Sequence, residues 1–130
     1  MNNFYLAATT TSPRIDFNFI ENQLSIKGES YPENAAAFYG PVIQALRSYL
    51  DTCTDAHILL DVALCYFNSS STKILYNIFS MLNDTACIGN RVTVHWYYDP
   101  EDDTMFDFGM ELQGDYSNIE LMMVSSDIGG

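Results

Sequence analysis

The segment Ile58-Leu-Leu-Asp-Val-Ala-Leu-Cys-Tyr-Phe67, followed by Asn68-Ser-Ser-Ser-Thr72, carries the main fold signal of this chain. Residues 58–67 are nearly all apolar apart from Asp61, which predicts a central strand covered on both faces. From Lys73 to Ala86, apolar residues recur at the three-and-four spacing of an amphipathic helix. A buried strand joined to a helix by a short polar junction predicts an α/β domain.

The same patterns recur on both sides of this segment. A first helix is expected over residues 35–50, capped by Asn34, with Pro41 either kinking it or starting its regular part. Alternating or β-branched runs predict a hairpin early in the chain and two later strands, and a short helix is expected between those later strands. The remaining predicted elements are the hairpin strands 14–20 and 23–28, the strands 91–98 and 118–124, and the short helix 104–113.

These elements predict one α/β domain over residues 1–130, with helices packed against a mixed sheet of about five strands. The polar, threonine-rich segment 1–12 and the segment 125–130 are expected to be loose tails. No internal repeat or linker divides the chain. A length of 130 residues suits a single hydrophobic core.

The formal charge of −12 and the isoelectric point near 4.1 exclude nucleic acid and anionic membrane surfaces as partners. A partner with a basic surface is compatible with this charge, although acidic side chains also keep proteins soluble. No apolar run approaches the length of a membrane span, so direct membrane insertion is not expected. The first residues lack the basic region of a signal peptide, which predicts a cytoplasmic protein.

Cofactor and metal sites find no support in the sequence. The three cysteines, at 53, 65 and 87, form no C-x-x-C pair and are expected to be buried free thiols. The acidic run after Asp99 lacks the central glycine of a calcium loop. Neither of the usual glycine-rich nucleotide-binding motifs is present. We therefore expect no bound metal and no cofactor.

Two other function classes can be weighed against the chain. A small hydrolase would need a serine beside His57 or His95, but no G-x-S-x-G motif is present and His95 lies within a predicted strand. A constitutive adaptor could use the aromatic and acidic segment Trp96–Asp103, because aromatic residues dominate interface hot spots. At least one aromatic residue of Trp96-Tyr-Tyr98 must face the core, however.

The hydroxyl-rich junction offers a different chemistry. A serine that follows a buried strand is exposed but rigidly held, and phosphorylation would add about −1.5 to −2 charge and three acceptor oxygens. Ser69 suits this role best, which leaves Ser70 or Ser71 to cap the helix; either of these is the less favoured acceptor. Lys73, on the first helical turn, could pair with the added charge. Asn68 and Thr72 complete the surroundings of the site.

Three motifs, Gly28-Glu-Ser-Tyr-Pro-Glu-Asn34, Tyr66-Phe-Asn-Ser-Ser-Ser-Thr-Lys73 and Val94-His-Trp-Tyr-Tyr-Asp99, together resemble the SiaC family of regulatory phosphoproteins. The resemblance extends from about residue 15 to residue 122. It implies a STAS-like fold, similar to that of anti-sigma-factor antagonists, and a regulator without enzymatic activity of its own.

In that family, the hydroxyl residue directly after the asparagine of the strand-end motif is phosphorylated. The matching residue here is Ser69, where the family often has threonine. The resemblance implies three partners: a serine/threonine kinase of the anti-sigma-factor type, a PP2C-like phosphatase, and a diguanylate cyclase or similar effector. The unmodified form would activate the cyclase and so raise cyclic di-GMP, the messenger of biofilm control.

The segment Gly28–Asn34 is expected to lie near Ser69, because loops at strand ends cluster on one edge of an α/β sheet. Tyr31, Glu33 and Asn34 are therefore candidates for partner docking, unless Tyr31-Pro32 only shapes the loop before the first helix. Two other readings of the function stay open at this stage: a constitutive adaptor, and a STAS-type antagonist of an anti-sigma factor.

Overall fold

The computed structural model describes residues 2–126 of the chain and contains one six-stranded sheet and three helices. In chain order, the elements are β1 (Phe4–Leu6), β2 (Arg14–Asn18), β3 (Gln23–Ser30), α1 (Ala35–Leu50), β4 (His57–Phe67), α2 (Ser69–Cys87), β5 (Arg91–Tyr98), α3 (Asp103–Asp115) and β6 (Glu120–Ser125).

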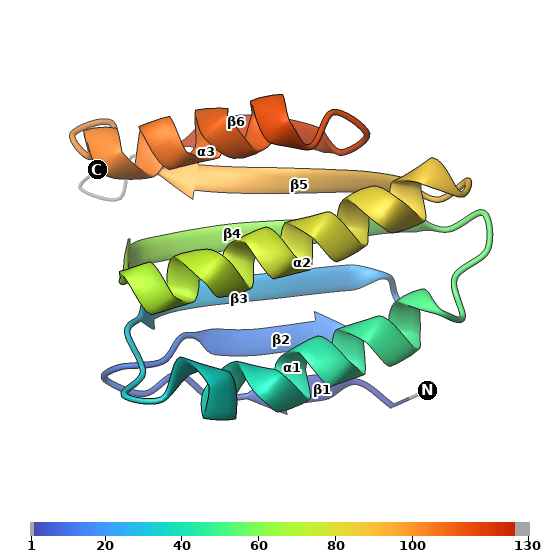
Figure 1. The fold of residues 1–130 in the computed structure, drawn as a ribbon, viewed down its shortest axis with the longest axis horizontal. Helices are drawn as coiled ribbons and strands as arrows, with labels where there is room; N and C mark the ends of the chain where they lie inside the picture. The colour runs from blue at the N-terminus through green and yellow to red at the C-terminus, as the bar shows by residue number, and fades with distance from the viewer. Residues whose placement is uncertain (1, 127–130) are drawn as a thin grey trace.

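The strands lie in the sheet in the same order as in the sequence. β1, β2 and β3 are antiparallel neighbours, whereas β3 to β6 are parallel and are connected through the helices. Because consecutive right-handed crossovers step in one direction across the sheet, they place every helix on the same side. Figure 1 shows α1, α2 and α3 side by side over one face of the sheet.

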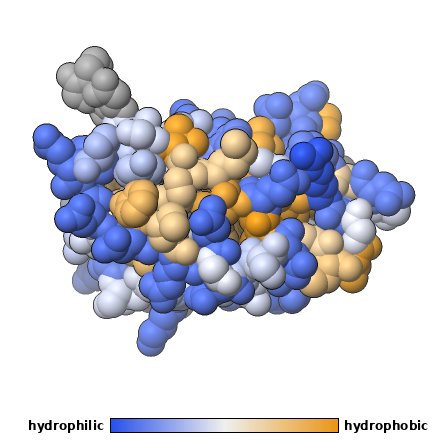
Figure 2. All heavy atoms as spheres, turned by 90° about the horizontal axis from the view of Figure 1, so that it is seen from above, coloured by the Kyte–Doolittle hydropathy of each residue, from blue (hydrophilic) through white to orange (hydrophobic). Residues whose placement is uncertain are grey.

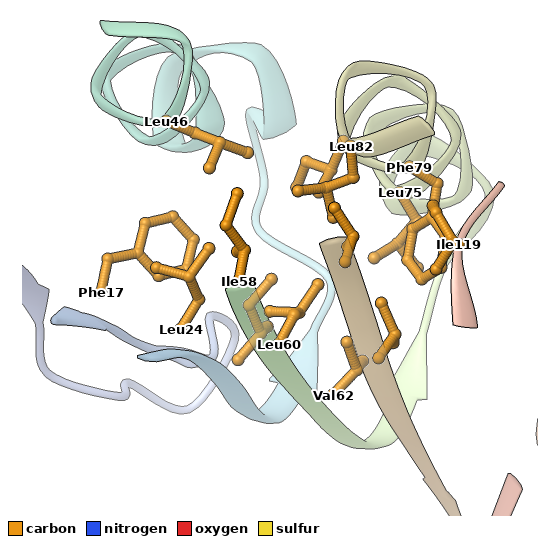
Figure 3. Packing of buried hydrophobic residues seen from close by; sticks show 14 of the residues in the cluster. Phe17, Leu24, Leu46, Ile58, Leu60, Val62, Leu75, Phe79, Leu82 and Ile119 are labelled. Carbon is orange, nitrogen blue, oxygen red and sulfur yellow. The ribbon is translucent and has the colours of Figure 1, made fainter. Parts of the chain in front are cut away.

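The hydrophobic core lies between this face and the helices (Figure 3). Ile58, Leu60 and Val62 of β4 are at most 1% exposed, and Leu46 of α1 and Leu82 of α2 point toward the sheet from above. Complete burial of such aliphatic side chains contributes about 1.5–3 kcal/mol each. The core therefore ties both long helices to the central strand.

The opposite face of the sheet carries no helix, and we call it the open face. It comprises the strand side chains that alternate with the core residues, as in the row formed by Asp16, Ser25, Asp61, His95 and Met122 across β2 to β6. The prediction that residues 58–67 are covered on both faces is therefore wrong. The uncovered side of this strand is composed largely of small or apolar residues, which hid the alternation.

The prediction of about five strands misses β1 at the edge of the sheet. Phe4 pairs with Phe17 of β2, so residues 4–6 belong to the sheet and not to a loose tail. At the other end, Ser125 belongs to β6, and the Ser126 amide donates a 2.7 Å hydrogen bond to the Tyr98 carbonyl. Residues 127–130 of the second predicted tail lie outside the described residues.

The predicted helices are confirmed, with changes at their starts. Asn34 caps α1 as expected, its side-chain oxygen accepting a 3.0 Å hydrogen bond from the Ala37 amide. The helix continues through Pro41, so its regular part does not begin there. α2 begins at Ser69, four residues before the predicted start.

α3 packs closely on β5 through a glycine. A β-carbon at Gly109 would lie 2.5 Å from Cδ1 of Trp96 and 2.7 Å from Cε of Met123. Trp96 is fully buried, and its indole N–H donates a 2.9 Å hydrogen bond to the Met105 carbonyl. The largest side chain of the segment Trp96–Asp103, suggested as an adaptor surface, is therefore not available to a partner.

Two further expectations can be compared with the structure. The cysteines are not buried: Cys65 and Cys87 are exposed and Cys53 is half-buried. Cys65 follows the buried Leu64 in β4 and lies on the side of the strand that the helices do not cover. Among residues 2–126, none of the helices has the length and hydrophobicity that crossing a membrane requires.

Candidate functional site

The predicted site lies at the edge of the sheet where β3 and β4 end and where α1 and α2 begin; we call this the strand-end edge. Parallel neighbouring strands end on the same side of a sheet, and this geometry brings Ser30 next to Phe67 in register. The Asn68 amide donates a 3.0 Å hydrogen bond to the Ser30 carbonyl. The expectation that segment 28–34 lies beside the hydroxyl junction is confirmed.

Asn68, and not a serine, caps α2. Its side-chain oxygen accepts a 3.0 Å hydrogen bond from the Ser71 amide, and its carbonyl accepts the Thr72 amide at 3.1 Å. The Thr72 hydroxyl donates to the same carbonyl at 3.2 Å. The prediction that Ser70 or Ser71 caps the helix is wrong, because asparagine is as good an N-cap as serine and stands one turn earlier.

Ser71 anchors the start of α2 in the core. It is 1% exposed, and its hydroxyl donates a 3.0 Å hydrogen bond to the Ser30 carbonyl. The Ser30 hydroxyl lies 2.8 Å from that of Ser71 and 2.5 Å from that of Tyr39 in α1. Burial raises the pKa of Tyr39, so this phenol stays protonated and can donate to Ser30. The three hydroxyls link β3, α1 and α2.

Ser69 and Ser70 differ from Ser71 in their surroundings. Both are exposed, and neither hydroxyl makes a hydrogen bond to any of the described residues. Ser69 is the first residue of α2, where a helix leaves backbone N–H groups free and where its dipole favours negative charge. Of the three serine hydroxyls, that of Ser71 is therefore structural, and those of Ser69 and Ser70 are accessible.

Lys73 lies one turn after Ser69 and is exposed. It lines a shallow groove of about 730 Å³ between the first turns of α1 and α2, together with Glu33, Ser70 and Ile74. Within residues 2–126, Lys73 forms no ion pair. Since residues four apart on a helix are neighbours, its ammonium group can reach an anion placed on Ser69.

The three predicted docking residues lie at the same edge but are not equivalent. Glu33 and Asn34 both line the groove, yet the side-chain oxygen of Asn34 is already used by the cap of α1. The Tyr31 ring packs edge-on against Tyr66, with ring centroids 5.6 Å apart, and its amide donates to the Thr11 carbonyl at 2.8 Å. Glu33 is thus the one whose side chain is free to meet a partner.

Ser30 is the residue that sequence reasoning missed. It lies just after the expected strand 23–28, in a segment that reads as a loop, and nothing in its local sequence distinguishes it from an exposed turn serine. Its role comes from the parallel pairing of β3 with β4, which a single sequence does not display. A serine preceding Tyr31-Pro32 gave only a loop signal.

Other chemistry-bearing residues are not part of this edge. Within residues 2–126, no three His, Cys, Asp or Glu side chains are placed to hold a metal ion. The Nδ1–H of His95 donates a 2.9 Å hydrogen bond to the Asp61 carboxylate on the open face. Asp102 caps α3 by accepting a 3.1 Å hydrogen bond from the Met105 amide.

Similar proteins come from Pseudomonas aeruginosa. A protein of strain UCBPP-PA14 is 29% identical over 117 residues, which is 90% of this chain and 92% of that protein. The crystal structure of apo-SiaC superposes with a TM-score of 0.87 at 27% identity and covers 95% of this chain and 99% of its own.

The structure of the diguanylate cyclase SiaD in complex with its activator SiaC, also from Pseudomonas aeruginosa, contains a chain equally similar to this one. The TM-score is 0.87, the identity is 27%, and the match covers 95% of this chain and 99% of that chain. The sequence model of the SiaC family covers residues 6–126, which includes every element from the end of β1 to β6. This chain belongs to the SiaC family of regulatory phosphoproteins.

Proposed function

We propose that this protein is a partner switch without enzymatic activity, controlled by phosphorylation of Ser69. The unmodified form binds and activates a diguanylate cyclase, a serine/threonine kinase of the anti-sigma-factor type modifies it, and a PP2C-like phosphatase reverses the modification. The similarity to a SiaC chain that is the activator of a diguanylate cyclase supports the choice of effector.

The observation that carries the proposal is the contrast among the three serines. Ser71 is buried and hydrogen-bonded, whereas the Ser69 hydroxyl is exposed and unbonded among the described residues. Ser69 also follows the helix cap directly, so its backbone position is fixed. Ser69 therefore offers a kinase a hydroxyl that is accessible and is carried on a fixed backbone.

Phosphorylation controls partner binding through surface charge and not through unfolding. Phosphate on Ser69 adds about −1.5 to −2 charge at the positive end of α2, a position that a helix tolerates well. Lys73, four residues on, pairs with this charge inside the same chain. The groove between α1 and α2 then offers a partner an anion where it previously offered a free cation and a small hydroxyl.

The absence of a catalytic arrangement in residues 2–126 supports a regulatory role. Neither histidine is hydrogen-bonded to a serine: His57 contacts Thr93, and His95 contacts Asp61. Both pairs lie on the open face, away from the hydroxyl cluster at the strand-end edge. A serine nucleophile needs a base within hydrogen-bond reach.

Titration of a diguanylate cyclase from the same genome with three forms of the protein tests the proposal. Wild type and Ser69→Ala should bind and raise cyclase activity, while Ser69→Asp should bind at least about tenfold more weakly. Intact mass before and after phosphatase treatment should locate a removable phosphate on Ser69 of protein taken from cells. Equal binding by all three forms, with no phosphate found, would support a constitutive adaptor instead.

A further inference from the structure

The open face of the sheet has a charge balance unlike that of the remaining molecule. It carries the three cations Arg14, Lys27 and Arg91 and the four carboxylates Asp16, Glu29, Asp61 and Glu120, so its formal charge is only −1. The chain holds 5 Lys and Arg and 17 Asp and Glu in total. Of the net charge of −12, −11 therefore lies on the helices, the loops and the ends of the chain.

Parallel strands normally have both faces covered, because helices follow each crossover. Here β3 to β6 are parallel, yet all the helices lie on one side (Figure 1). Apolar side chains remain on the uncovered side: Leu59, Ala63, Tyr97 and Val124 are partly exposed, and Met122 is 53% exposed. A nearly neutral, partly apolar sheet face is suited to packing against a second layer.

Polar atoms on this face also lack partners. Nε of Arg14 and Oγ of Ser25 are buried and have no hydrogen-bond partner among the described residues. Arg14 lies directly opposite Lys27 in the sheet, although like charges in that position repel one another, and neither forms an ion pair within residues 2–126. A carboxylate arriving from outside would satisfy both cations.

We infer that a second copy of this chain packs on the open face, so that the two sheets lie face to face. Each copy offers the carboxylate of Asp16, which forms no ion pair within residues 2–126, to the other copy's Arg14 and Lys27. This face lets two copies meet with little opposing net charge, since −11 of the −12 of each chain then lies away from the contact. A strongly basic partner would be drawn to the acidic helical side instead.

This arrangement is independent of the proposed switch and compatible with it. The strand-end edge carries Ser69 and the groove on the helical side of the sheet, which a face-to-face pair leaves open. A pair of this kind would present two phosphoacceptor edges at once. An effector that is itself dimeric could then be bound at two points.

Figure 2 shows the edge of the molecule formed by α3 and β6, along which hydrophobic side chains form a band between hydrophilic ones. Two exposed methionines of these elements make a matched pair of test sites. Met122 on β6 belongs to the open face, and Met110 on α3 is 44% exposed on the helical side. The same substitution at each changes net charge equally but alters only one of the two surfaces.

Sedimentation velocity of the wild-type protein between about 5 and about 500 μM should reveal a concentration-dependent dimer. Met122→Glu should weaken this dimer at least about tenfold, and Met110→Glu should leave it unchanged. A second pair of variants, Ala63→Lys on the open face and Ala36→Lys on the exposed side of α1, should behave in the same way. Circular dichroism establishes that each variant is folded.

A wild-type protein that sediments as a monomer throughout this range would overturn the inference. A dimer that Met110→Glu weakens as much as Met122→Glu would overturn it too, because the contact would then lie along the α3 and β6 edge. Neither result would affect the phosphorylation proposal, which is tested by cyclase binding and by mass.

Discussion

The hydroxyl of Ser71 lies 2.8 Å from the hydroxyl of Ser30, 41 positions earlier in the chain. Through this contact, the first turn of α2 is fastened to the end of β3 and, by way of Tyr39, to α1. The neighbouring Ser69 is therefore presented by a rigid support, although its own side chain contacts none of the described residues. A phosphate added there therefore changes the charge of a surface whose backbone is already fixed.

Ser71→Ala should lower the free energy of unfolding by about 1–3 kcal/mol, because it removes the buried hydrogen bonds of the Ser71 hydroxyl to the hydroxyl and the carbonyl of Ser30. Ser70→Ala is the matched control and should stay within about 0.5 kcal/mol of the wild type, since Ser70 is exposed. Urea unfolding followed by circular dichroism measures both. Equal effects of the two substitutions would contradict the assignment of Ser71 to the core.

Asn68→Ala should cost about 1 kcal/mol of stability through loss of the cap on α2. Asn68→Asp should retain most of that stability, because its carboxylate also accepts the Ser71 amide and favours the helix dipole. Thermal unfolding of the two variants makes the comparison. The capping role would be refuted by an alanine variant as stable as the aspartate variant.

Ser69→Asp should raise the stability of the protein by about 0.3–1 kcal/mol, because it places a negative charge on the first turn of α2. Part of this gain should depend on the cation four residues later, so it should shrink in a Lys73→Gln background. A double-mutant cycle in urea at low salt isolates the coupling. If Ser69→Asp lowers the stability of the protein, phosphorylation would instead control partner binding by melting the structure locally.

Gly109→Ala should destabilise the fold by about 1–3 kcal/mol, because the added methyl group meets Trp96 and Met123 well inside contact distance. Gly114→Ala is the natural control on the same helix: no atom lies within 4 Å of its β-carbon, and alanine favours helix by up to about 1 kcal/mol. The two changes should therefore have opposite signs in denaturant unfolding. Equal effects would show that α3 does not approach β5 as closely as described.

Tyr76 supplies a pH-dependent test of the packing of α2 against α3. Its hydroxyl donates a 2.7 Å hydrogen bond to Glu111, which raises the pKa of Tyr76 from 10.0 to about 12. Since the folded pKa lies above the unfolded one, the stabilising contribution is complete below pH 10 and is lost as the pH rises toward 12. Glu111→Gln should lower the pKa of this phenol in an absorbance titration.

Tyr76→Phe serves as the control for that titration, because it removes the phenol while keeping the ring. The ionisation step near pH 12 should lose the amplitude of one tyrosine in this variant. If the amplitude does not change, another tyrosine is responsible and the contact with Glu111 does not set it.

Some of the fold could be predicted from local patterns alone. Asn34 precedes an apolar stripe of helical spacing, so its role as a cap could be predicted. The long run 58–67 was recognised as the central strand, but its two faces were not told apart, since Leu59 and Ala63 on the open face are as apolar as core residues. β1 was too short, at three residues, to give a pattern.

The site could be located but not fully resolved from the sequence. Four adjacent hydroxyl residues marked the junction, yet Ser70 and Ser71 both fitted a cap, and only the hydrogen bonds assign that role to Asn68. The burial of Ser71 depends on Ser30, and their proximity is a product of parallel strand pairing. A single chain carries no signal for a contact of that range.

Because all the crossovers run in the same direction, the helices start at one end of the molecule and finish at the other. α1, α2 and α3 all start at the strand-end edge, each with an asparagine or aspartate side chain accepting a hydrogen bond from the amide three residues later. The connections that follow the three helices, at residues 51–56, 88–90 and 116–119, all lie at the far end. Fluorescent labels or loop insertions placed there can report on the protein in living cells while leaving the end that carries Ser69 untouched.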